Sequence, residues 1–361
     1  ISLGFASGLG LSSYWRLVSH FGSPGAVLAA SRRELLRVEG IQERHVSGVF
    51  PVSEIMERGQ KELDRLAEIG AAAISYDCQA YPSILKELID PPPVLFIAGK
   101  TELLHQPVVA IVGSRAATAY GKRTAFSLAQ KLASYRVTVA SGLALGIDTE
   151  AHAGALAGLG KTVAVLGCGL DVAYPAKNKE LYQAIACRGA LVSEYPLGTR
   201  PEGFRFPARN RIIAGLSAGV VIVEAAKRSG SLITAQIALD YGREIFAVPG
   251  QVDSFKSEGT HWLLKQGARL VQEVDDIVEE LHLQRSECVV APDIKKNNDL
   301  QLDPEAAALL EYIEPYPQLR QLLLEKSGLV PGRLSELLLF LELEGLIEML
   351  PGDQLRRVSA P

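Results

Sequence analysis

The first group of residues suited to binding chemistry follows an apolar run at 108–112. Gly113, Ser114 and Arg115 come directly after these five residues. A glycine at the end of a buried strand lets a ligand approach the backbone, and the amino end of the next helix attracts anions. Arg115 adds a planar cation that suits a phosphate or a stacked base. We therefore predict an anion site here, with a tight turn and a solvated arginine as the alternative.

A second loop repeats this arrangement. Ser141 and Gly142 follow apolar residues 137–140 and precede a helical pattern that begins near Asp148. Backbone amides in a loop that opens a helix have no partner within the helix. We therefore predict that this loop contacts a second phosphate, beside the one at the first loop. Asp148 and His152 are four residues apart and share a helix face. An acid–base or metal pair is one interpretation, but a capping aspartate beside a packed histidine is favoured.

A third group combines arginines with aromatic residues. Residues 200–211 contain four arginines, one acid and two phenylalanines. Phosphates need charge and unstacked bases need aromatic faces, so the pattern favours a single-stranded DNA platform over solvated arginines at a helix start. A loop at 224–231 follows another apolar run and completes the rim, although its serines are equally suited to capping a helix. The predicted DNA-binding residues are Gly113, Ser114, Arg115, Ser141, Gly142, Arg205, Phe206, Arg209, Asn210, Arg211 and Lys227.

The elements that position these loops alternate between strand and helix. Apolar runs at 108–112, 137–140, 162–166, 190–193, 220–223 and 245–248 have the composition of strands buried on both faces. Amphipathic stretches at 121–134, 148–158, 210–217 and 231–242 separate them. Repeated strand–helix units predict an α/β fold with a Rossmann-like, doubly wound, mostly parallel sheet, whose ligands bind at the carboxyl ends of the strands.

Three further segments surround this core, which we place at 76–283. Residues 1–75 read as a small all-α domain of the helix-hairpin-helix type, for which packing and DNA contact are equally good interpretations because its eight basic and eight acidic side chains cancel. Residues 284–301 are polar and irregular, as in a linker. Residues 302–361 predict three helices and two strands around a Pro-Gly turn, a winged-helix-like domain. Its net charge of −5 favours packing or protein contact over DNA.

Composition excludes several classes of protein. The 361 residues are 48% hydrophobic with a net charge of −4, which excludes wholesale disorder. The sequence contains no run of eighteen apolar residues, so no membrane-spanning helix is predicted. The four cysteines are scattered, which fits reduced thiols in the cytoplasm better than disulfides or zinc. The GxxxxGK[ST] and GxGxxG motifs are both missing. We therefore expect a cytoplasmic protein that is not an enzyme, with no metal and no cofactor.

Taken in order, the motifs resemble one family, the DNA-processing DprA (Smf) proteins. The resemblance rests on the segments 111–121, 141–152, 167–175, 193–196, 206–217, 224–235, 242–250 and 259–268, and on Tyr81-Pro82 and Pro91-Pro92 before the core. It implies a sterile-alpha-motif-like domain in front, a winged-helix-like domain behind, and a core that binds single-stranded DNA without catalysis. It also implies a homodimer that loads the RecA recombinase in DNA recombination and natural transformation.

The same resemblance assigns roles to individual residues. The family's DNA motif corresponds to Gly113-Ser114-Arg115, and its base-stacking aromatic corresponds to Phe206. Gly203 stands where some members have a basic residue, so Arg205 or Arg200 is expected to supply that charge. The dimer and RecA-contact region corresponds to His261, Leu264 and Leu270, and Trp262 lies beside it. Packing in the core is an equally good interpretation of Trp262 and Leu264.

One alternative belongs to a different class. The core also resembles nucleotide phosphoribohydrolases of the lysine-decarboxylase-like family, which carry the signature PGGxGTxxE. The nearest stretch found by sequence is 248–252, Val-Pro-Gly-Gln-Val, which lacks the acidic residue. The binding protein is therefore the favoured prediction.

Overall fold

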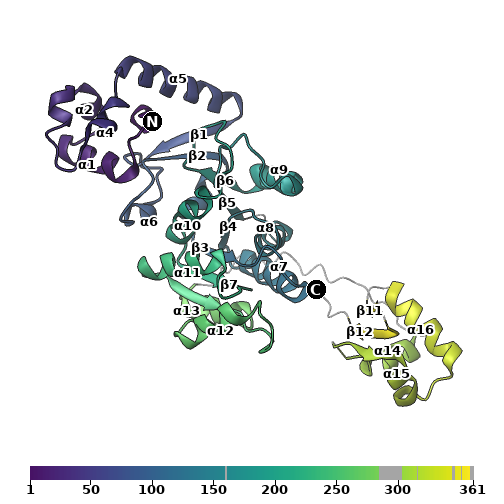
Figure 1. The fold of residues 1–361 in the computed structure, drawn as a ribbon. Coiled ribbons are helices and arrows are strands. Elements are labelled where there is room, and N and C mark those ends of the chain that lie inside the picture. The colour runs from purple at the N-terminus through teal and green to yellow at the C-terminus, as the bar shows by residue number, and fades with distance from the viewer. Residues whose placement is uncertain (159–160, 284–302, 315, 344–345, 351, 358–361) are drawn as a thin grey trace. The chain divides into compact units, whose positions relative to one another are not determined.

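The computed structural model describes residues 1–158, 161–283, 303–314, 316–343, 346–350 and 352–357. The chain forms two compact units, Ile1–Ser286 and Glu287–Pro361 (Figure 1). The predicted linker at 284–301 lies outside the described residues, so it stays a prediction. Among the described residues, no helix is both long and apolar enough to span a membrane.

The first unit begins with short helices around their own apolar core. Leu17, Leu35, Val46 and Ile55 are buried together in this core. Gly22 ends the first long helix because its φ of +85° is left-handed, a conformation that glycine adopts without strain. Ser31 and Glu34 form a capping box at the start of a later helix. The elements are η1 Ser2–Phe5, α1 Leu11–Phe21, α2 Pro24–Ala29, α3 Arg32–Leu35, α4 Glu43–Ser47 and α5 Val52–Glu68.

A large sheet forms the centre of the same unit. Within the described residues it has nine strands in the order β1-β2-β6-β5-β4-β3-β7-β8-β9. The pairs from β6 to β9 are parallel, whereas β2 is antiparallel to both β1 and β6. This confirms the predicted mostly parallel α/β fold. The strands are β1 Ala71–Ser75, β2 Val94–Gly99, β3 Val108–Val112, β4 Thr138–Ser141, β5 Thr162–Leu166, β6 Ala190–Ser193, β7 Gly219–Ile222, β8 Glu244–Ala247 and β9 Arg269–Leu270.

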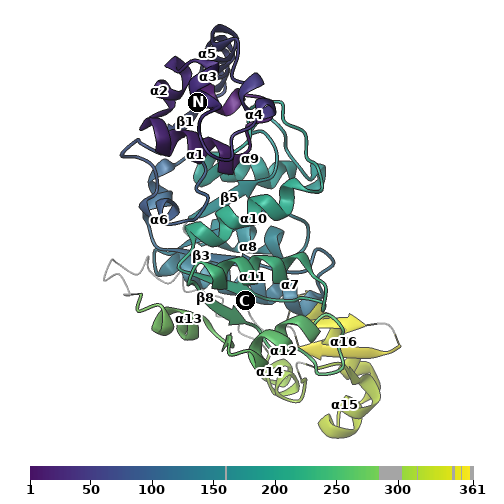
Figure 2. The ribbon, with the colours of Figure 1, turned by 60° about the vertical axis from the view of Figure 1, so that its left-hand side comes forward.

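Helices cover both faces of this sheet (Figure 2). One face buries Ala110 and Val112 of β3 against α10 and α11, and the other buries Val109 and Ile111 against α7 and α8. The helical segments are α6 Ser83–Lys86, η2 Thr101–His105, α7 Ala119–Ser134, α8 Ile147–Ala157, η3 Ala176–Asn178, α9 Lys179–Arg188, α10 Arg205–Leu216, α11 Gly230–Asp240, α12 Glu258–Lys265 and α13 Val274–Glu280.

The strand order reverses direction at β3. The strands β4, β5 and β6 extend the sheet on one side of β3, and β7 pairs with its other side. At such a switch point the loops after the two central strands diverge and leave a crevice at their carboxyl ends. The loops after β3 and β7 are therefore the expected walls of a ligand site.

Two features of this unit differ from the sequence-based expectations. The first is the pair β1 and β2, which lie at the sheet edge although the sequence analysis assigned 71–75 to the helical domain and predicted no strand at 94–99. Three of the five residues of β1 are alanine, which has little intrinsic strand preference, so pairing with β2 decides its structure. The second is α10, which begins at Arg205, five residues before the predicted helix.

The second unit has the predicted winged-helix fold. Its helices bury Leu309, Leu323, Leu334 and Leu341 in one core. Within its described residues, three strands pair antiparallel in the order β10-β12-β11. The elements are α14 Pro304–Glu311, β10 Gln318–Leu319, α15 Arg320–Ser327, α16 Pro331–Leu343, β11 Ile347–Leu350 and β12 Gln354–Arg357.

Candidate nucleic-acid interface

A cleft of about 690 Å³ opens at the carboxyl ends of β3 and β7. Its walls come from the loops after these strands, from the amino end of α8, from a loop after β5, and from α10 and α11. The residues that line it include Gly113, Ser114, Arg115, Asp148, Tyr174, Phe206, Arg209, Asn210, Ser229, Gly230, Ser231 and Thr234. The switch point thus brings together segments that are more than a hundred residues apart in the sequence.

The loop after β3 places an arginine at the edge of the cleft. Gly113 must be small, because a Cβ there would lie 2.7 Å from Ile147 Cγ1 and 3.0 Å from the Glu224 carbonyl oxygen. Arg115 is exposed, and it forms no ion pair with any residue that the structure describes. Its guanidinium carbon lies 5.6 Å from the centre of the Phe206 ring. A phosphate that reached Arg115 would therefore lie beside an aromatic ring.

Two aromatic rings extend this surface. Phe206 stacks on Tyr174 with a centroid separation of 5.6 Å and an interplanar angle of 21°. Phe206 comes from α10 and Tyr174 from the loop after β5, so only the folded sheet brings them together. The sequence analysis missed Tyr174 as a site residue. The signal available was its place in the loop that follows a third parallel strand.

A buried polar cluster lies beneath the cleft and holds its second loop. Arg209 is only 5% exposed; its Nη1 donates to the Gly142 carbonyl over 2.8 Å and also to the Val165 carbonyl. The Asp148 carboxylate accepts hydrogen bonds from the Gly142 and Ala144 amides over 3.1 and 3.3 Å. Burial lowers the pKa of Arg209 to about 10 and raises the pKa of Asp148. These contacts make Arg209 a support of the loop at 141–147, although it was predicted to bind DNA.

His152 is packed in the same cluster. Its Nδ1 lies 2.7 Å from Thr162 Oγ1, and the Thr162 hydroxyl donates its own proton to the Val139 carbonyl. Nδ1 must therefore carry the imidazole proton, which leaves Nε2 buried without a partner among the described residues. Burial lowers the pKa of His152 to about 3. This geometry agrees with a packed histidine, and no group of three potential metal ligands occurs in the described part of the chain.

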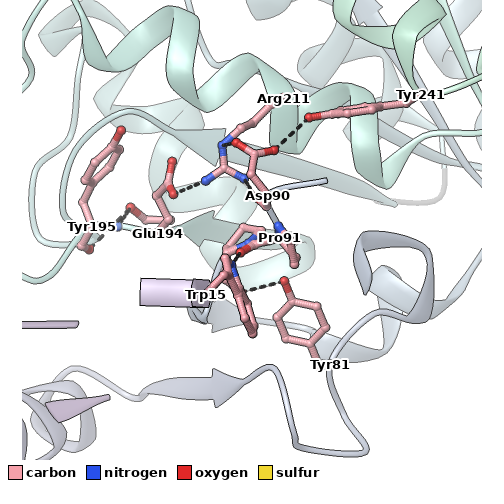
Figure 3. Close-up of polar contacts among 10 residues, drawn as sticks. Trp15, Tyr81, Asp90, Pro91, Glu194, Tyr195, Arg211 and Tyr241 are labelled. Atoms are coloured by element: carbon pink, nitrogen blue, oxygen red, sulfur yellow. Dashed lines mark hydrogen bonds and ion pairs between the residues drawn. The ribbon is translucent and has the colours of Figure 1, made fainter. Parts of the chain in front are cut away.

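Arg211 lies away from the cleft, contrary to the placement expected from sequence. It donates to the Asp90 carbonyl over 2.7 Å and pairs with the Glu194 carboxylate (Figure 3). Tyr241 donates to Asp90, and Trp15 of α1 donates to the Pro91 carbonyl over 2.8 Å. Residues two apart on a helix point in different directions, so Arg209 and Arg211 cannot share one surface. Arg211 instead links Asp90, the residue before Pro91, to Glu194, the residue after strand β6.

The remaining predicted residues divide between the cleft wall and its surroundings. Ser141 is buried and donates to the Ile111 carbonyl over 2.7 Å, so it supports the loop. Arg205 packs over the Tyr195 ring at 4.9 Å and pairs with Glu202 at 3.4 Å. Lys227 is exposed next to Ala226, which lines the cleft. Asn210 and Ser114 line the cleft directly.

The residues predicted for the dimer and RecA contact occur on and after α12. Leu270 and Trp262 are each 48% exposed, and Leu264 is half-buried. His261 Nε2 lies 3.1 Å from the Gly250 carbonyl oxygen. Exposed apolar side chains of this size are suited to an interface.

In the structure, a different segment from the one identified by sequence matches part of the signature PGGxGTxxE. Residues 248–252, identified by sequence, follow β8 and do not line the cleft among the described residues. The spacing G-T-x-x-E instead matches Gly230-Ser231 and Thr234 in α11, with threonine in the place of the acid. Among the described residues that line the cleft, Asp148 is the one carboxylate, and two backbone amides occupy it. The acidic residue of the signature therefore has no counterpart at this place in the described cleft.

Comparison with known proteins gives consistent matches. Residues 72–282 match the family described as DNA recombination-mediator protein A, and residues 295–353 match the DprA winged helix domain. Protein Smf of Escherichia coli is 42% identical over 294 residues, which cover 78% of this chain and 76% of that protein. DNA processing protein DprA of Streptococcus pneumoniae is 45% identical over 228 residues, covering 60% and 80%.

Solved structures show the same relationship. DNA processing protein A from Streptococcus pneumoniae aligns with a TM-score of 0.67 and 38% identity, covering 77% of this chain and 95% of that chain. DNA processing protein A from Helicobacter pylori, described for its single-stranded DNA binding mode, aligns with a TM-score of 0.55 and 34% identity, covering 60% and 97%.

Proposed function

Since the chain belongs to the DprA (Smf) family of DNA-processing proteins, we propose that its cleft binds single-stranded DNA. The observation that carries this proposal is the position of Arg115 over the Phe206 ring, which itself stacks on Tyr174. A cation without an acidic partner attracts a phosphate, and an aromatic face offers a stacking surface to any base. One cleft thus provides both interactions that a single strand needs.

This arrangement predicts the character of the binding. The phosphate contact makes affinity fall as salt rises, because binding releases counterions from the strand. Stacking does not distinguish bases strongly, so affinity should be tolerant of sequence. A duplex keeps its bases stacked inside, and unstacking one costs a few kcal/mol. Single strands should therefore bind better than duplexes.

We further propose that the protein acts as a homodimer and delivers the bound strand to the RecA recombinase, as a mediator in recombination and natural transformation. The exposed side chains Trp262 and Leu270, with His261 and Leu264 beside them, are the candidate contact surface. Such a role requires the protein to bind and release DNA without reacting with it. The Asp148 carboxylate, which accepts hydrogen bonds from two backbone amides, agrees with a structural role for this acid.

Fluorescence anisotropy of a labelled oligo-dT and its duplex across a salt series tests the binding proposal. We expect salt-dependent binding that is tighter for the single strand. Failure of the folded protein to bind the oligo-dT would contradict it, and incubation with nucleoside monophosphates would then test for base release.

Light scattering tests the proposed homodimer, and a recombinase assay tests the proposed RecA loading. Leu270→Glu places a charge in the proposed contact surface, so we expect the particle mass to halve. Wild-type protein should speed RecA ATP hydrolysis on single strands coated with single-strand-binding protein. A wild-type monomer would refute the dimer, and an unchanged ATPase rate would refute the loading role.

A further inference from the structure

The amino end of α11 opens into the same cleft as Arg115. Ser229, Gly230 and Ser231 all line the cleft there. Ser229 caps the helix by accepting from the Ser231 amide over 3.3 Å, and the two hydroxyls lie 2.7 Å apart. A Cβ at Gly230 would meet no described atom within 4 Å, so the backbone is open to a ligand. Amides at the start of an eleven-residue helix favour an anion.

One turn further along the helix lies a threonine whose hydroxyl has no hydrogen-bond partner among the described residues. Thr234 lines the cleft and is 2% exposed, yet its side chain forms no hydrogen bond with any residue that the structure describes. Threonine and serine in helices often donate to the carbonyl four residues earlier. Thr124 does so to Tyr120 over 2.9 Å, and Ser217 to Ile213 over 2.8 Å. The Thr234 hydroxyl therefore lines the cleft with its hydrogen-bonding capacity available to a ligand atom.

The charges around this helix end favour an anion as that ligand. Lys227 and Arg228 are exposed on the preceding loop, and neither forms an ion pair within the described residues. The carboxylate of Asp148, which also lines the cleft, already accepts two backbone hydrogen bonds. A negatively charged group would therefore meet helix amides, a hydroxyl donor and two nearby cations.

We propose that the amino end of α11 and Thr234 form a second anion subsite, which holds a phosphate group of the same DNA strand whose other phosphate contacts Arg115. This inference rests on the proposed binding of single-stranded DNA and adds a second fixed point to it. With one phosphate at the loop after β3 and another at α11, the strand would cross the cleft past the Phe206 ring.

Two substitutions test the subsite without disturbing the fold. Thr234→Val keeps the branched shape and removes only a hydroxyl that has no partner in the free protein, so the melting temperature should stay equal or rise. Gly230→Ala adds a methyl group where there is open space, at a helix position that tolerates alanine. We expect Thr234→Val to weaken oligo-dT binding about three- to tenfold through the loss of one hydrogen bond to a charged group. Gly230→Ala should weaken binding to a similar extent because its methyl group occupies the space that the phosphate needs. Thr124→Val on α7 is the matched control and should bind like the wild type.

Oligo-dT with and without a 5′-phosphate distinguishes the two sources of the phosphate. Equal weakening on both oligonucleotides assigns the subsite to an internal linkage, and weakening only with the 5′-phosphate assigns it to the strand end. Both results support the subsite. Wild-type affinity of both variants on both oligonucleotides would overturn it while leaving DNA binding intact. If the wild-type protein itself binds neither oligonucleotide, the proposed function fails and the subsite fails with it.

Discussion

Basic side chains are arranged differently in the cleft and in the winged-helix unit. In the cleft, Arg115 and the neighbouring Lys227 have no acidic partner within the described residues. In the winged-helix unit, Arg333 pairs with Asp303, Glu305 and Glu336 between 2.9 and 3.1 Å. Arg320, Lys326 and Arg356 also pair with acids. A count of cations therefore says little about DNA binding, since availability depends on the neighbours of each one.

The two units also differ in their interiors. The first unit buries Asp148, His152 and Arg209 beneath its cleft, whereas the described part of the winged-helix unit buries no polar or charged residue. Buried polar groups stabilise a single arrangement only when their hydrogen bonds are satisfied. We infer that the first unit uses them to fix the loops of the cleft.

The largest expected effect concerns acid stability of the first unit. His152 takes up a proton in the unfolded chain near pH 6.5 but in the folded protein only near pH 3. Because burial lowers the pKa, stability from this residue is complete above pH 6.5 and is lost as the pH falls towards 3, on the order of 5 kcal/mol in total. His152→Asn keeps a hydrogen-bond donor and does not titrate, so its free energy of unfolding should fall less steeply with acid.

Tryptophan fluorescence during urea unfolding measures this slope, because both tryptophans, Trp15 and Trp262, belong to the first unit. Equal slopes for wild type and variant between pH 6.5 and 4 would contradict a neutral, buried His152.

The next effect is on DNA affinity. Arg115→Ala removes both the phosphate contact and the cation over the Phe206 ring, so we expect oligo-dT to bind about 30-fold more weakly. Arg333→Ala is the matched control, because its guanidinium is already occupied by three acids. Anisotropy at one fixed salt concentration compares them. Similar losses for both variants would mean that pairing does not decide which cations bind DNA.

Removal of the Phe206 ring should reduce DNA affinity less than removal of Arg115. Phe206→Ala should weaken oligo-dT binding about tenfold through the loss of stacking, and the salt dependence should not change because the ring is uncharged. Phe255→Ala, an exposed phenylalanine outside the cleft, serves as the control. A change in the salt slope of Phe206→Ala would show that the ring acts by placing Arg115, with no stacking of its own.

The smallest change in DNA affinity is expected from Lys227, at the rim of the cleft. Lys227→Ala should weaken binding about threefold and make the salt dependence shallower by about one charge. Lys326→Ala in the winged-helix unit removes a cation that lies 3.5 Å from Glu314, and its salt dependence should match the wild type. Salt titrations of both variants check this, and identical slopes would remove Lys227 from the DNA-binding surface.

Much of the cleft could be predicted because the signals are local. An apolar run followed by Gly113-Ser114-Arg115 indicates a strand end, and repeated strand–helix units place such ends along one edge of the sheet. The α/β fold, the winged helix and the family were predicted correctly on this basis. Phe206 lies in the cleft because the residues around it begin a helix at the same edge.

The sequence alone determined the six central strands, β3 to β8, the sheet edge at which their loops gather, and the grouping of arginines and aromatic rings at 200–211. The tertiary structure decided which of those arginines remain available. Arg209 and Arg211 lie on one helix, but one supports Gly142 and the other joins Asp90 to Glu194. It also brought Tyr174 to Phe206 and placed Thr234 in the cleft with no hydrogen-bond partner in the described part of the chain. The physical reason is that composition is local, whereas burial and hydrogen bonding depend on segments that meet only when the chain folds.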